Sequence, residues 1–78
     1  MPLYFFHVRG GHAPAEADEG WELEDESEAI RSARVAARSL IASDVLDGIL
    51  DLSARIEVED SLGNSVVTVP FASVVADP

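Results

Sequence analysis

The sequence contains no cysteine and no lysine, and each absence excludes a class of structure or partner. Without cysteine the chain has neither a disulfide framework nor a thiolate metal site, which suits a reducing compartment. Without lysine, five arginines face fifteen acids, and the formal net charge is −10. A field of this sign repels phosphates and anionic membranes, so we expect no nucleic-acid partner. It is compatible with solubility alone or with a basic protein partner.

Long apolar runs and catalytic signatures are also missing. No stretch approaches the ~20 apolar residues that cross a bilayer, and no basic segment followed by an apolar one opens the chain. We therefore expect a cytoplasmic protein with no membrane contact. The phosphate-loop, dinucleotide, zincin and serine-hydrolase motifs do not occur, and no carboxylate is set apart as an acid or base. We expect neither an enzyme nor a cofactor.

The length of 78 residues predicts a single domain, residues 1–78, close to the lower limit for folding without staples. Alternating apolar side chains and turn residues predict four strands, at residues 3–9, 21–23, 54–59 and 65–71. Residues 10–20 form an acidic loop, and residues 72–78 form a short C-terminal tail. Pro70 cannot donate to a ladder, so the last strand lies at an edge or its last residues leave the sheet. The first strand is apolar on both faces, which favours a central position.

The main helix is predicted over residues 25–48. Asp25 is a good N-cap with Glu28 three positions later, and Gly48 is the natural terminator. We expect a break or fraying near Ser43 and Asp44, because an unbroken helix would be about 33 Å long in a molecule about 30 Å across. The order strand–strand–helix–strand–strand predicts an α+β domain. In it, the amphipathic helix packs on one face of a small antiparallel sheet.

Three arginines, Arg31, Arg34 and Arg38, follow the helix at a spacing that places them along one edge. Together with His7 they are the candidate ligand-binding residues, because guanidinium groups bind carboxylates and phosphates. The alternative is that they pair with Glu28 and offset the acidic arm, residues 16–28, which contains eight carboxylates.

A metal site could be drawn only from the histidines and the nearby acids of the first loop, namely His7, His12, Glu16, Asp18 and Glu19. Two histidines five residues apart across a diglycine do not match a recognised ligand spacing. We therefore expect a structural His7, a solvated His12 and no metal.

Apolar side chains also lie on the strand faces that point away from the predicted helix, at Leu3, Phe5, Val66 and Thr68. One helix cannot cover both faces of a sheet, so these residues are candidates for an interface. We expect a homodimer that packs through this sheet face or pairs at a sheet edge. The alternative is that the first loop or the tail folds over the patch.

Three sequence segments resemble a family of short bacterial proteins classed as a domain of unknown function. They are the opening Met1-Pro2-x-Tyr-Phe-Phe-His-Val-Arg9, the middle Glu19-Gly20-x-Glu-Leu-x-Asp25, and the closing Thr68-Val-Pro-Phe71. The resemblance covers nearly the whole chain and supports the fold reading. It implies no catalytic or ligand residues.

Three candidate functions follow from the sequence. The first is a non-catalytic protein-binding or regulatory module. The alternative is a small-ligand or anion-sensing domain that uses the arginine edge. A third alternative is an antitoxin-type module, because the order of elements is similar to HicB-like antitoxins, which place a small sheet before an alanine-rich helix.

Overall fold

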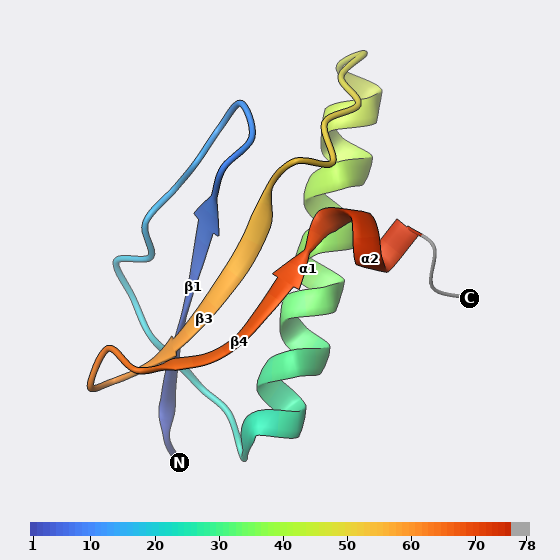
Figure 1. Ribbon diagram of the computed structural model, residues 1–78. Helices are drawn as coiled ribbons and strands as arrows, with labels where there is room; N and C mark the ends of the chain where they lie inside the picture. Colours follow the sequence, from blue (N-terminus) through green and yellow to red (C-terminus); the bar gives the residue numbers. More distant parts are fainter. Residues whose placement is uncertain (76–78) are drawn as a thin grey trace.

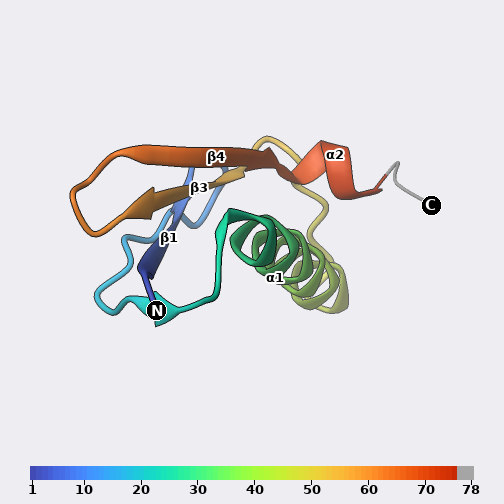
Figure 2. The same cartoon turned by 90° about the horizontal axis from the view of Figure 1, so that it is seen from below.

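The structure, a computed structural model, describes residues 1–75 and has the predicted α+β architecture (Figure 1). Along the chain lie β1 (Leu3–Arg9), β2 (Trp21–Glu22), α1 (Glu26–Leu46), β3 (Arg55–Asp60), β4 (Ser65–Pro70) and α2 (Phe71–Val75). The four strands form one antiparallel sheet, and α1 lies across one of its faces (Figure 2). The strand–strand–helix–strand–strand order is therefore confirmed.

The strands are arranged in the order β2-β1-β3-β4. This order confirms the central position of β1 and the edge position of β4 that Pro70 indicates. Phe6 pairs with Val58, and Val8 pairs with Ile56. Because side chains alternate along a strand, these four point to the same face, toward α1. The register shifts between Val58 and Glu59, so β4 is bulged close to its start.

Helix α1 begins and ends at the residues that the sequence indicates. The Asp25 carboxylate accepts a hydrogen bond from the Glu28 N–H at 3.0 Å. At the other end, the Gly48 N–H donates to the Val45 carbonyl at 2.9 Å, and the Ile49 N–H donates to the Asp44 carbonyl at 2.8 Å. With Gly48 at φ 80°, this is a Schellman C-cap.

The break expected near Ser43 and Asp44 was wrong, because α1 continues to Leu46. The expectation assumed a nearly spherical molecule. The domain instead measures 37 × 27 × 16 Å, so a helix of about 31 Å fits along its longest dimension.

The core lies between α1 and the strands β3 and β4 (Figure 2). Ala29, Ala33 and Ala37 on α1 are fully buried against strand residues such as Ile56 and Val58. A line of alanines lets the helix axis approach the sheet closely, which is favourable for packing. Because these side chains are short, the helix covers only a narrow strip of the sheet.

The last strand ends one residue earlier than predicted, since Phe71 begins α2. Phe71 and Val74 are both buried, and the Phe71 N–H donates to the Ala54 carbonyl at 3.0 Å. The predicted tail, residues 72–78, therefore starts as a short docked helix. Its residues 76–78 lie outside the described part of the chain.

Candidate functional site: an apolar groove between α1 and β1

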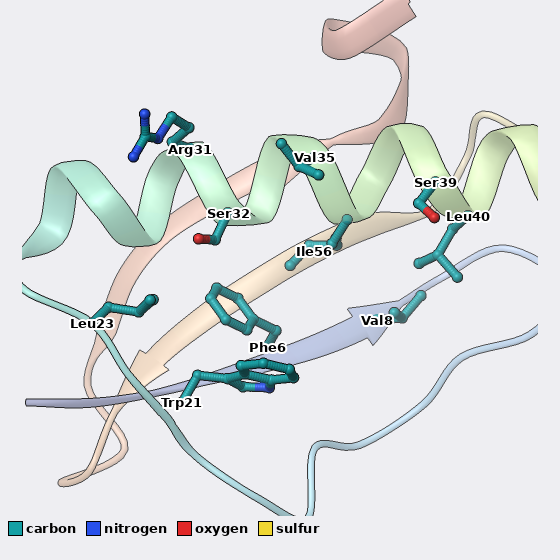
Figure 3. A pocket seen from close by; sticks show the side chains of 11 residues that line it. Phe6, Val8, Trp21, Leu23, Arg31, Ser32, Val35, Ser39, Leu40 and Ile56 are labelled. Carbon is teal, nitrogen blue, oxygen red and sulfur yellow. The ribbon is translucent and has the colours of Figure 1, made fainter.

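Helix α1 covers only part of the sheet face on which it lies. Beside it, over β1, is an open groove with a volume of about 810 Å³ (Figure 3). We call it the α1–β1 groove. The sheet contributes apolar residues from β1 and β3, and the segment at β2 contributes two more. The lining residues are Phe6, Val8, Ile56, Trp21 and Leu23 on this side and Arg31, Ser32, Val35, Ala36, Ser39 and Leu40 on α1.

The groove is open because the flank of α1 that faces β1 carries short side chains. Ser32, Ala36 and Ser39 are spaced i, i+4 and i+7, which places them along one flank of a helix. Figure 3 shows Ser32 above the ring of Phe6, with the Trp21 indole beside that ring. A hydroxymethyl or methyl group is too short to close the gap, whereas a leucine would fill part of it.

Several large apolar side chains along the groove remain exposed to solvent. Trp21 is 64% exposed, Val35 is 57% exposed and Leu40 is 40% exposed. A contiguous apolar surface on a small domain marks an interaction site more often than scattered exposed residues do. The sequence signal was the Ser-x₃-Ala-x₂-Ser spacing together with the single tryptophan, and the sequence prediction gave neither of them a binding role.

The groove is apolar inside, and the segment that contributes Trp21 and Leu23 to it is rich in acids. Trp21 and Leu23 belong to the acidic arm, residues 16–28, where five exposed acids lie within eight residues: Asp18, Glu19, Glu22, Glu24 and Asp25. These five acids are part of the overall charge of −10. A positive potential on a partner would therefore be attracted to this side of the molecule.

The arginine edge lies apart from the groove except for Arg31. The Arg31 guanidinium is paired with both carboxylate oxygens of Glu28, at 2.7 and 2.6 Å. This hydrogen bond and the charge of Glu28 raise the pKa of Arg31. Figure 3 shows the guanidinium directed away from Phe6 and Trp21. Arg34 and Arg38 each have interactions of their own, and neither lines the groove.

His7 lies on the opposite face of the sheet from α1, so the structure does not bring it to the three arginines. Its ring is buried, with 7% of the residue exposed. Nδ1 accepts a hydrogen bond from the Ala17 N–H at 3.0 Å, and Nε2 lies 3.1 Å from Oε1 of Glu59.

Charged residues surround His7 on this outer face. The Glu16 carboxylate lies 2.9 Å from Nδ1 and also pairs with Arg9. Arg9 bonds in turn to Glu57 at 3.2 Å. Because Glu16 and Ala17 belong to the loop at residues 10–20, the network attaches this loop to the outer face of the sheet.

His12 attaches the same loop at a second place. Its Nδ1 lies 3.1 Å from Asp51, and its Nε2 lies 3.6 Å from Asp44 of α1. Hydrogen bonds from the Ser53 hydroxyl and backbone, and then from His12, lower the pKa of Asp51 to about 2. Within residues 1–75, no group of three or more His, Cys, Asp or Glu side chains is arranged so that it could hold a metal ion.

The four interface candidates do not form one continuous patch. On the outer face, Phe5 pairs with Glu59 of β3, and Thr68 of β4 pairs with Glu57. The charged side chains of β3 therefore separate the β1 candidates from the β4 ones. Val66 packs against the core.

The loop at residues 10–20 covers part of the patch on β1. Gly20 is close enough that an added Cβ would lie 3.0 Å from Cζ of Phe5 and 3.2 Å from Cβ of Leu3. Phe5 is half-buried as a result, and Leu3 is 37% exposed.

The architecture defines a small α+β domain with an open apolar groove, and its sequence was compared with those of known families. The family model for a domain of unknown function (DUF6894) matches residues 3–72, so the chain belongs to that family. No curated protein and no solved structure is significantly similar to it. None of the described helices is both long and apolar enough to span a membrane.

Proposed function

We propose that this chain is a non-catalytic protein-binding module that holds a segment of a partner in the α1–β1 groove. The observation that carries the proposal is the open apolar groove, in which Trp21 and Val35 are more than half exposed. Burying such side chains against a partner contributes roughly 25 cal/mol per Å² of apolar surface. Leaving this apolar surface exposed to water contributes no stability to a domain this small.

The partner is expected to be basic around its apolar contacts. The acidic arm contributes Trp21 and Leu23 to the groove, and the whole chain carries a charge of −10. Charge complementarity of this kind speeds association and weakens as salt rises. The absence of cysteine fits a cytoplasmic place of action, where thiols stay reduced.

The proposal can be tested with a model peptide that carries leucines on one side and lysines on the other. An analogue with glutamate in place of lysine has the same apolar content and serves as the charge control. Titration of isotopically labelled protein should perturb the Trp21 indole and the methyl groups of Val8, Leu23 and Leu40. Methyl signals of Val75, on α2, should stay in place. The glutamate analogue should bind more weakly at low salt.

A matched pair of variants assigns the binding to the groove. Ser32→Leu places a large side chain in the groove and should abolish peptide binding, whereas Ser43→Leu makes the same change at an exposed residue of α1 outside the groove. Equal binding by both variants, or peptide-induced shifts confined to other surfaces, would contradict the proposal.

Homodimerisation through the sheet is a second candidate, and one observation favours it. Strand β4 is outermost, and residues 65–75 contain no charged side chain, in a chain where 26% of residues are charged. The bulge near Val66 and Pro70 at the end leave only a short stretch of edge for pairing. Light scattering across micromolar concentrations would show a dimer mass if β4 pairs, and a monomer mass would remove this candidate.

The anion-sensing and antitoxin-type alternatives stay predictions. For the first, Arg31 is already paired with Glu28, so an anion would have to displace that carboxylate. Thermal stabilisation by a carboxylate or phosphate metabolite would support it.

A further inference from the structure

We infer that the segment held in the α1–β1 groove is a basic amphipathic α-helix that lies along α1. The inference rests on the proposed function and specifies the conformation and charge of the partner segment. Extended segments and helices bind proteins through different features, a free strand edge in the first case and an apolar trough in the second. The surroundings of the groove distinguish the two.

An extended segment has little strand edge to join beside the groove. Strand β1 is already paired on that side, because Leu3 faces Glu22 and Tyr4 faces Trp21. Further along, the Val8 N–H and carbonyl bond to Ala15 at 2.8 and 2.9 Å. The edge strand next to the groove, β2, has two residues. The longer edge, β4, lies at the other side of the sheet.

A helix matches the helical wall of the groove. Ser32, Ala36 and Ser39 form a shallow flank, and small residues allow two helix axes to approach to roughly 8–10 Å. The α1 residues that line the groove run from Arg31 to Leu40, which is about 14 Å of helix at 1.5 Å per residue. That length accommodates anchor side chains at i, i+4 and i+7 of a partner helix.

The negative charge of the chain favours a basic helix and disfavours a second copy of this chain. A second copy would bring another −10 to an already acidic surface, and like charges facing each other oppose association. A helix with Lys or Arg beside its apolar stripe would instead bring cations into the negative field of the acidic arm, which contributes Trp21 and Leu23 to the groove.

The test compares two basic peptides of identical composition, about 18 residues long, because shorter helices are marginal in water. In the first peptide the leucines recur at helical spacing and a single proline is at the first position. In the second, the same proline is moved to the middle, where it breaks a helix. Calorimetry should show the first peptide binding at least about tenfold more tightly, and circular dichroism should show its helix content rising in the complex.

Two variants of equal charge, one in the groove and one on α2, provide the control. Val35 is 57% exposed beside the groove, and Val75 is 56% exposed on α2. Val35→Lys should weaken binding of the helical peptide by about tenfold or more, and Val75→Lys should leave it close to wild type.

The outcomes separate this inference from the proposed function. If both peptides bind equally in the groove, the groove is a binding surface but its partner need not be helical, and the inference is overturned. If the glutamate analogue binds as tightly as the basic helix, the basic character is overturned. If neither basic peptide binds, the proposed function itself fails.

Discussion

Nε2 of His7 lies 3.1 Å from Oε1 of Glu59, and this contact joins β1 to β3 on the face of the sheet opposite α1. The other ring nitrogen accepts the Ala17 N–H, so the imidazole links two strands and the loop at residues 10–20. This loop also covers Phe5. The outer face is thus partly covered by the chain itself, whereas the α1–β1 groove on the inner face stays open.

Replacing His7 should destabilise the fold. His7→Leu leaves the Ala17 N–H and the Glu59 carboxylate without this partner, and a donor or acceptor left unsatisfied costs about 1–3 kcal/mol. Urea unfolding of the wild type and the variant measures the loss. His12→Leu is the control, because the His12 side chain is 40% exposed and its contacts are solvated. An equal loss of unfolding free energy in the two variants would show that the contacts of His7 stabilise the fold no more than those of His12 do.

The packing of α1 predicts opposite effects at two adjacent residues. Ala33 is fully buried against the sheet, so Ala33→Leu should overpack the core and cost about 1–3 kcal/mol. Ser32 faces the open groove, so Ser32→Leu should leave the free energy of unfolding unchanged or raise it. Chemical denaturation of both variants makes the comparison. A large loss in Ser32→Leu would mean that the groove is closed in solution.

Two glycines with similar backbone conformations differ in the space around them. Gly11 has φ 71°, and an added Cβ would lie 2.8 Å from Cβ of Ala54. Gly63 has φ 82° with nothing within 4 Å. Gly63→Ala should cost about 1–2 kcal/mol from the left-handed backbone alone, and Gly11→Ala should cost about 1–3 kcal/mol more because Ala54 must move. Similar melting temperatures for the two variants would contradict this packing of the loop.

Acidification should weaken the link between the first loop and residues 51–53. The pKa of Asp51 falls from 3.8 to about 2 in the folded protein. A carboxyl with a lowered folded pKa stabilises the native state above its unfolded pKa, and that stabilisation disappears as the pH falls from about 4 to about 2. Asp51→Asn should therefore differ most from the wild type above pH 4, and the difference should shrink by pH 2. Urea unfolding at several pH values checks this. A difference that stays constant across the range would refute the assignment.

The elements of the fold could be predicted because their signals are local. The N-cap at Asp25, the glycine at 48 and the alternation around Ile56 and Val58 each act within a few residues. The continuity of α1 at Asp44 was missed because it depends on the overall shape, since a flat domain 37 Å long has room for the whole helix.

The groove was missed for a related reason. Its openness depends on where α1 sits across the sheet, over β3 and β4, and the sequence does not specify that lateral position. Ser32 and Ser39 are polar, so the sequence pattern places them toward solvent, which is correct for an isolated helix. Only the placement of Phe6 and Trp21 opposite them turns a flank of small residues into one wall of a groove.

The most direct test of the groove as a binding surface uses Trp21, the single tryptophan of the chain. It is 64% exposed, so its emission should be that of a solvated indole and acrylamide should quench it readily. Saturation with the basic helical peptide, which itself contains no tryptophan, should shift the emission to shorter wavelengths and protect it from acrylamide. A peptide that binds while Trp21 stays as accessible as before would show that the partner docks elsewhere.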